Sequence, residues 1–351
     1  NRAALIFQTD PVDTPPVAAA DKSSVPVWAT GGRIQLSIED YVDCVLIARP
    51  NGVQAPTDND TLILPNSISR KRCWNSVMRT ARYLETVREC RCKNSDLSKI
   101  PLLVSIAGGN DLEIRKQAIK QTDFSQASGV VIDGISTLPN DETAGDFPNT
   151  DRDTSYLFST LIPGICTELP PALPRFITGI WQPKHIALAA RAGVDLFDGS
   201  LPYRLTRSAV GWIYPGWSSS ENKHSSSHDF HSRYLVFPLG GSDDPSDGKY
   251  ETPIQPECKC FTCTHHSRGY VSHMHIAKEM LGPMLLMIHN SHQCYRFFRD
   301  LRHCLASGQI DQFVEFSSLW EFPAKLLSVD RTFESKTANN NPLDDVLPVV
   351  Y

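Results

Sequence analysis

Residues 102–132 read LLVSIAGGNDLEIRKQAIKQTDFSQASGVVI, and this stretch decides the fold class. It opens with the apolar run Leu102–Ile106 and closes with a second run, Gly129–Ile132. Nearly continuous runs of Val, Ile and Leu are typical of parallel strands that are buried on both faces. Between them, Asp111–Lys120 carries apolar residues at helical spacing. The stretch therefore predicts a βαβ unit and a parallel sheet.

The same alternation recurs along most of the chain. Further apolar runs lie at Ala3–Phe7, Gly52–Ala55, Arg175–Thr178 and Asp195–Phe197, and further helical patterns at Ser69–Cys90, Asp153–Cys166 and Pro183–Ala192. Repeated strand-then-helix units without a long antiparallel pattern predict an α/β fold of the irregular (β/α)8, TIM-barrel type. An open doubly wound sheet is the alternative.

The predicted domain boundaries lie where the alternation of strands and helices stops or changes. We expect the (β/α) barrel over residues 1–211, an irregular Ser- and Gly-rich insertion over 212–252, a zinc-binding subdomain with closing helices over 253–322, and a C-terminal tail over 323–351. The insertion contains His224, His228 and His231. Their spacing gives no rigid helical face, so a second metal site there is not favoured.

Composition and charge describe an ordinary globular protein of 351 residues, with 41% hydrophobic residues and a formal net charge of -5. No apolar run approaches the roughly 20 residues that span a bilayer, and residues 1–7 lack the features of a signal peptide. We therefore expect a cytoplasmic protein. The acidic balance argues against strong autonomous binding of nucleic acid, because such binding depends on phosphate neutralisation by Lys and Arg.

Three of the ten cysteines crowd into the segment Cys258-Lys-Cys260-Phe-Thr-Cys263. In an intracellular chain such crowding favours a metal site over disulfides, with reactive or buried thiols as the alternative. Zinc prefers four ligands in a tetrahedron, and three Cys with one His form a closed, structural set. These residues alone leave the fourth ligand open. His289 is favoured, and its competitors are His265, His266, His273 and His275.

Two stretches of the chain resemble the tRNA-guanine transglycosylase family. The first combines the cysteine segment with Arg268–His273 (RGYVSH) and Leu285–Asn290 (LLMIHN), and the second is Gly193–Arg204 (GVDLFDGSLPYR). Weaker similarity extends from about Ala3 to about Leu319. The resemblance implies a (β/α)8 barrel whose first elements would precede Asn1. It also implies one structural Zn2+ bound by Cys258, Cys260, Cys263 and His289, and it places Asp198 at the position of the family's nucleophile.

The departures from the family pattern concern its catalytic residues. Catalytic members carry an Asp-Ser-Gly-Gly motif, which this sequence lacks, and an amide at the position of Ala107. Trp181 stands where the resemblance requires a small residue, while Gly199 and Tyr203 replace a Cys and a Thr. Base exchange needs a nucleophile and a second group that handles protons. Asp198 is therefore predicted to be inactive, and no residue of the chain is predicted to be catalytic.

This pattern is similar to the non-catalytic, accessory branch of the family. The resemblance implies a heterodimer with a catalytic queuine tRNA-ribosyltransferase subunit, which exchanges guanine for queuine at the wobble position of tRNA, and peripheral association with the mitochondrial outer membrane. We expect pairing through the zinc module and the helix with Tyr295, Phe297 and Phe298, although core packing explains these rings as well. Arg204 and Arg207 are the expected phosphate contacts.

Two other functions remain open at this point. One is an active transglycosylase that uses Asp198 as its nucleophile, and the other is a zinc-containing RNA-binding module without base exchange. Asp58 falls near the family's base-recognising Asp, but a strand-end Asp is more often a helix cap or turn residue. The basic residues of Ser69–Cys90, among them Arg79, are interpreted as a solvated helix face.

Overall fold

The computed structural model describes residues 4–8, 10, 20–29, 32–58, 69–135, 155–179, 182–217, 234–239, 249–320 and 322. The chain divides into two compact units. Unit 1 comprises Asn1–Trp181 and Leu188–Asp198, and unit 2 comprises Gln182–Ala187 and Gly199–Tyr351. The four-part division expected from the sequence stays a prediction. Most of its insertion, including the three histidines, and its tail lie outside the described residues.

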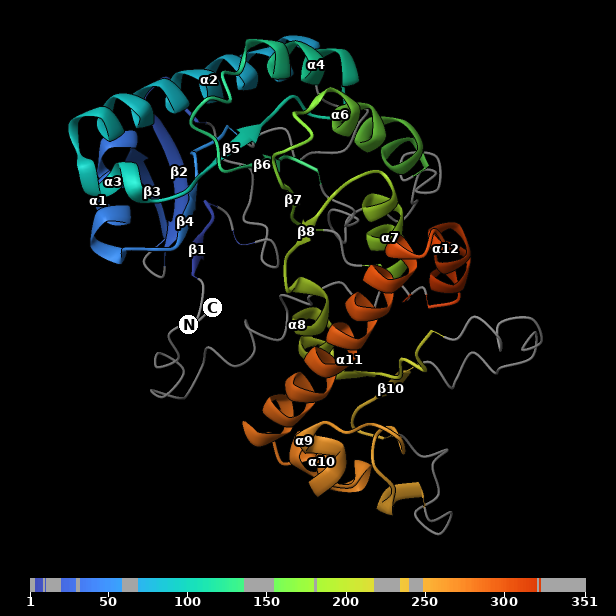
Figure 1. Cartoon of the computed structure of the whole chain (residues 1–351). Helices are drawn as coiled ribbons and strands as arrows, with labels where there is room; N and C mark the ends of the chain where they lie inside the picture. The colour runs from blue at the N-terminus through green and yellow to red at the C-terminus, as the bar shows by residue number, and fades with distance from the viewer. Residues whose placement is uncertain are drawn as a thin grey trace. The chain divides into compact units, whose positions relative to one another are not determined.

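Unit 1 is built on a six-stranded sheet in the order β1-β4-β5-β6-β7-β8 (Figure 1). Its strands are β1 (Leu5–Ile6), β4 (Gly52–Gln54), β5 (Leu102–Ile106), β6 (Gly129–Ile132), β7 (Arg175–Ile177) and β8 (Leu196–Phe197). All neighbouring pairs are parallel. The predicted α/β class and parallel sheet are therefore confirmed. The strands follow one another without the reversal of order that a doubly wound sheet requires.

The sheet is curled rather than flat. The rings of Phe7, directly after β1, and Phe176, in β7, have centroids 6.1 Å apart. Four strand spacings separate β1 from β7, which would amount to about 19 Å in a flat sheet. The contact therefore requires the sheet to bend round as a half-barrel.

The helices of unit 1 pack against this sheet, and α2 and α4 run along its outer side in Figure 1. They are α1 (Ile38–Ala48), α2 (Arg70–Lys93), α3 (Ser95–Lys99), α4 (Leu112–Gln121), the π-helical turn η1 (Leu157–Leu161) and α6 (Ile162–Glu168), while α7 (Pro183–Arg191) is divided between the units. Ser37, Ser69 and Asp111 cap α1, α2 and α4, because each side chain accepts a backbone N–H of the first turn.

An antiparallel hairpin of β2 (Ser24–Ala29) and β3 (Gly32–Ser37) lies between β1 and α1 in the chain. Neither this hairpin nor α1 was predicted from the apolar patterns of the sequence. One face of the hairpin joins the core of α1, α2 and the sheet, where Val25, Ile38, Val53 and Tyr83 are buried together.

Unit 2 is mainly helical. Its elements are α8 (Ser200–Arg207), the antiparallel pair β9 (Val210–Trp212) and β10 (Tyr234–Val236), η4 (Lys249–Glu251), α9 (Phe261–His265), α10 (Arg268–Ile276), α11 (Leu281–Ala306) and α12 (Ile310–Ser318). The long helix α11 contacts α8, α9, α10 and β9. Among the described residues of both units, no helix is long and apolar enough to cross a membrane.

An aromatic cluster forms the core beside α11. Phe297 is only 1% exposed and has ring neighbours in Trp212, Tyr214 and Phe313, at centroid distances of 5.7, 5.8 and 5.3 Å. The expectation that Phe297 forms part of a partner interface is therefore wrong, because its ring is used in the core of its own chain. Tyr295 is exposed, as an interface residue must be.

Candidate metal centre

The cysteine segment is fixed by local structure in unit 2. The N–H of Cys258 bonds to the carbonyl of Gln255, and Cys260 is the N-cap of α9. The Thr262 hydroxyl donates to the carbonyl of Leu285 at 2.6 Å, which attaches α9 to α11 one turn before His289. The three cysteines and His289 thus come from two elements that are hydrogen-bonded together.

The four side chains converge on one point. The Nδ1 atom of His289 lies 3.8 Å from Cys258 Sγ, 3.6 Å from Cys260 Sγ and 3.3 Å from Cys263 Sγ. All four potential ligand atoms lie within 4.8 Å of one another. A tetrahedral zinc with Zn–S of about 2.3 Å and Zn–N of about 2.0 Å separates its S and N ligands by about 3.5 Å. The group therefore has the size of a tetrahedral zinc site.

The surroundings of the four residues also suit a metal. His289 donates its Nε2 proton to the carbonyl of Trp212 at 2.8 Å, which directs Nδ1 at the sulfur atoms, where it can bind a metal once it has lost its proton. Gln293 donates to Cys258 Sγ at 3.1 Å, and the N–H of Cys263 approaches Cys260 Sγ at 3.4 Å. Such outer hydrogen bonds fix the tautomer of a ligating His and stabilise thiolates. Gln293 was not predicted, although its spacing of four residues from His289 places it on the same helix face.

The protonation of the cluster reflects the crowding of its thiols. Hydrogen bonds from the side chains of Cys260 and Cys263 lower the pKa of Cys258, and the corresponding contacts with Cys258 and Cys260 raise the pKa of Cys263. Burial lowers the pKa of His289, but its hydrogen bonds with Cys258 and Cys260 outweigh burial and raise the pKa to about 9. A divalent cation would remove this competition for protons, because it favours all three thiolates together.

Asp198, at the carboxyl end of β8, directs its carboxylate at the backbone that follows the neighbouring strand β7. Its Oδ2 accepts the N–H of Gly179, after β7, at 2.6 Å.

Ala107 is buried after β5, and Trp181 lies outside the described residues. Arg204 is only 3% exposed, so the expected phosphate contact through Arg204 is wrong, whereas Arg207 is exposed.

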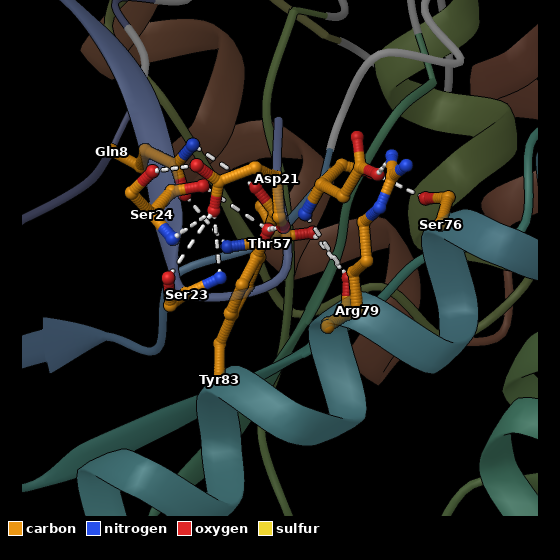
Figure 2. A network of polar contacts seen from close by, with 10 residues as sticks. Gln8, Asp21, Ser23, Ser24, Thr57, Ser76, Arg79 and Tyr83 are labelled. Atoms are coloured by element: carbon orange, nitrogen blue, oxygen red, sulfur yellow. Dashed lines mark hydrogen bonds and ion pairs between the residues drawn. The ribbon is translucent and has the colours of Figure 1, made fainter. Parts of the chain in front are cut away.

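A polar network lies beyond β4, and Figure 2 labels Thr57, Ser76 and Arg79 within it. Asp58 belongs to this network. Its buried carboxylate pairs with Arg79 at 2.8 Å, its N–H donates to Thr80 Oγ1 at 3.0 Å, and its carbonyl accepts the hydroxyl of Ser76. The expectation that Asp58 is a helix cap or turn residue is therefore wrong, because its carboxylate forms a buried ion pair. The solvated-face interpretation is also wrong for Arg79, because that side chain bonds inward to Asp58.

A second buried network joins the ends of β4, β5 and β6. Gln54 donates to Asp133 Oδ2 at 2.8 Å and to Ser105 Oγ at 3.1 Å. The fully buried Arg115 donates to the carbonyl of Asp133 at 2.7 Å. Burial raises the pKa of Asp133, although the N–H of Gly134 opposes this effect. Asp133 was not predicted as a site residue, although an Asp directly after a predicted barrel strand is itself a signal of a site.

Comparison with known proteins places this chain in a family. The family described as Queuine tRNA-ribosyltransferase matches residues 11–319. The chain is 30% identical over 317 residues to a queuine tRNA-ribosyltransferase accessory subunit 2 of Anopheles gambiae, with 89% of this chain and 68% of that protein covered. It is 28% identical over 331 residues to the protein of the same name of Xenopus tropicalis, with 87% and 75% covered. The chain therefore belongs to the queuine tRNA-ribosyltransferase family.

Proposed function

We propose that this chain is the accessory, non-catalytic subunit of a heterodimeric queuine tRNA-ribosyltransferase, and that it supports the exchange of guanine for queuine in tRNA. Relatives covering most of the chain carry that subunit's name. The observation that carries the non-catalytic role is the hydrogen bond of 2.6 Å between the N–H of Gly179 and Asp198 Oδ2. A carboxylate oxygen that stabilises the backbone in this way is a poor nucleophile, because attack by that oxygen on a sugar carbon would cost it this contact.

Two further carboxylates at the described strand ends support the same conclusion. Base exchange requires a proton-handling group beside the nucleophile. Asp58 is paired with Arg79, and Asp133 accepts from Gln54 and from the N–H of Gly134. Both carboxylates are buried in contacts within the chain, so neither is available to act on a bound base.

The cluster of Cys258, Cys260, Cys263 and His289 is proposed to bind one structural zinc ion. Four protein ligands leave no open position for chemistry, so the ion would stabilise the packing of α9 against α11. We also propose that the curled sheet of unit 1 is part of an irregular (β/α)8 barrel. The association with the mitochondrial outer membrane that the resemblance implies has no support among the described residues.

The partner surface is proposed to lie on unit 2, beside the metal cluster. Four large side chains of α11 are exposed at spacings of three, four and seven residues, namely Leu281, Met284, Ile288 and Tyr295. This spacing places them on one face of the helix. An exposed stripe of apolar and aromatic side chains next to a rigid metal-bound loop is typical of a protein–protein interface. Its occupant is proposed to be the catalytic homologue.

The Ile288→Asp variant should weaken pairing with a catalytic subunit by about 30-fold or more, because it buries an unpaired charge in the interface. Ile47→Asp is the matched control, since Ile47 is an isoleucine on helix α1 of unit 1 and is 83% exposed, against 41% for Ile288. Sedimentation of the mixed subunits at micromolar concentration measures the effect. Equal pairing of the two variants, or no pairing of the unmodified chain, would contradict the proposal.

Asp198→Ala should leave the base-exchange rate of the heterodimer unchanged and reduce the stability of unit 1 by about 1 kcal/mol, because the N–H of Gly179 loses its acceptor. Asp198→Asn keeps an acceptor oxygen and should retain most of that stability. Incorporation of labelled queuine into tRNA measures exchange, and urea unfolding measures stability. A loss of exchange in both variants, with folding intact, would instead identify this chain as an active transglycosylase.

A further inference from the structure

The β2–β3 hairpin has two chemically different faces. Its register pairs Val25 with Leu36 and Val27 with Ile34, and these side chains form the apolar face. Val25, Val27 and Leu36 pack on the core of unit 1, whereas Ile34 is 50% exposed. The alternate pairs are Pro26 with Gln35 and Trp28 with Arg33. Because successive side chains on a strand point to opposite faces, Trp28, Arg33 and Gln35 share the other face. Trp28 is 44% exposed, and Arg33 and Gln35 are also exposed.

The base of the hairpin is held firmly by α2 (Figure 2). The hydroxyl of the buried Tyr83 donates to the carbonyl of Asp21 and approaches the carbonyl of Ser24 at 3.2 Å. The carboxylate of Asp21 accepts the N–H groups of Ser23 and Ser24 at 2.7 and 2.8 Å. The exposed face is therefore presented by a fixed support rather than by a loose loop.

The polar side chains on this face are arranged in a row. Arg33 donates to Gln35 Oε1 at 3.3 Å, and Gln35 donates to Ser24 Oγ at 2.9 Å. Arg33 is the cross-strand partner of Trp28, so their Cβ atoms are about 5 Å apart, and the hydrogen bond to Gln35 orients the guanidinium along the same face. An indole plane beside an oriented guanidinium is suited to stack one nucleobase and contact its phosphate.

We propose that the Trp28–Arg33 face of the hairpin binds an unpaired nucleotide of the tRNA that the complex modifies, which rests on the function proposed above. The hairpin lies in the connection after the carboxyl end of β1, and Asp198 lies at the carboxyl end of β8 in the same parallel sheet. In barrels of this type, substrates bind at that end of the strands. The hairpin would thus position tRNA without taking part in chemistry.

The composition of the exposed hairpin face favours RNA over a protein partner. Lys22 and Arg33 are exposed cations. The nearby carboxylates of Asp21 and Asp40 already accept hydrogen bonds from serine side chains, at 2.7 Å from Ser24 and 2.6 Å from Ser37. Trp28 is the one large apolar side chain that this face exposes among the described residues, whereas a protein interface needs an apolar core of several residues.

The test compares Trp28→Ala with Ile34→Ala in the purified heterodimer. Ile34 is the matched control, because it is 50% exposed on the same hairpin but belongs to the apolar face. Trp28→Ala should weaken equilibrium binding of labelled tRNA by about 10-fold or more, while Trp28→Phe should keep most of the affinity. Arg33→Ala should lower the dependence of log affinity on log salt by about 1, since one phosphate contact is lost.

The outcomes separate this inference from the proposed function. Equal affinities for the Trp28→Ala and Ile34→Ala heterodimers would overturn it. A loss of subunit pairing in Trp28→Ala, with unchanged tRNA affinity of the assembled complex, would overturn it in favour of a protein contact. If the unmodified chain does not pair with a catalytic subunit, the proposed function fails instead. Photocrosslinking of tRNA to the chain alone at low salt, where even weak binding through phosphate contacts is detected, then decides the hairpin, with a crosslink at Trp28 expected and its absence contradicting the inference.

Discussion

His289→Ala should abolish tight zinc binding by this chain. The imidazole supplies the single nitrogen of the cluster, at 3.3 to 3.8 Å from the three sulfur atoms, and no other described His or Cys belongs to the group. Loss of a direct ligand should reduce zinc affinity by more than the roughly 10- to 100-fold that outer-shell changes cost. Hydrogen exchange should accelerate in α9 and α10, because a bound metal would connect their loop to α11, while unit 1 should stay folded.

His292→Ala is the matched control, since His292 lies one turn further along α11 and outside the cluster. It should keep one zinc per chain and normal exchange rates. Cys260→Ser should behave like His289→Ala, with the metal lost and residues 258–304 loosened. Metal analysis after dialysis against a chelator gives the first readout and hydrogen exchange the second. Zinc retained at one per chain in both His289→Ala and Cys260→Ser would eliminate this ligand set.

The metal cluster could be predicted because its signal is local and chemical. Three cysteines within six residues leave few interpretations, and the resemblance supplied His289 where spacing alone left five histidines open. The parallel sheet could be predicted as well, since β5 and β6 coincide with the apolar runs Leu102–Ile106 and Gly129–Ile132. The hairpin was missed for a physical reason. Its β2 contains Pro26 and its side chains are buried on one face only, so its pattern is weaker than that of a central strand.

The polar networks at the strand ends could not be predicted from local patterns. Ser105 and Asp133 lie 51 and 79 residues after Gln54 in the sequence, and only the register of three parallel strands brings the three side chains together. Asp58 and Arg79 likewise meet because α2 packs beside the end of β4. A sequence pattern shows that a residue lies at a strand end, but its partner depends on tertiary packing.

Arg115→Met should destabilise unit 1 strongly, by about 3 to 5 kcal/mol. The guanidinium is fully buried and donates to three carbonyls, those of Gly109 at 2.6 Å, Ile106 at 2.7 Å and Asp133 at 2.7 Å. It therefore joins the carboxyl ends of β5 and β6. Methionine fills similar space but removes the side-chain donor of all three carbonyls. The carbonyl of Ile106 keeps the N–H of Asp133 at 3.2 Å, and each acceptor left unpaired costs about 1 to 3 kcal/mol before relaxation. It also removes the positive charge that lowers the pKa of the buried Asp133.

Arg115→Lys separates the charge of this side chain from its geometry. Lysine keeps a cation near Asp133, but its single ammonium cannot reproduce the planar fork that reaches three carbonyls, so an intermediate loss is expected. Lys120→Met is the control on the same helix, because Lys120 is exposed and its replacement should change stability by less than about 0.5 kcal/mol. Urea unfolding, followed by hydrogen exchange of the β5 and β6 amides, measures all three variants. If Arg115→Met were as stable as Lys120→Met, the strand ends would be held by packing alone, and the buried guanidinium would have no structural role.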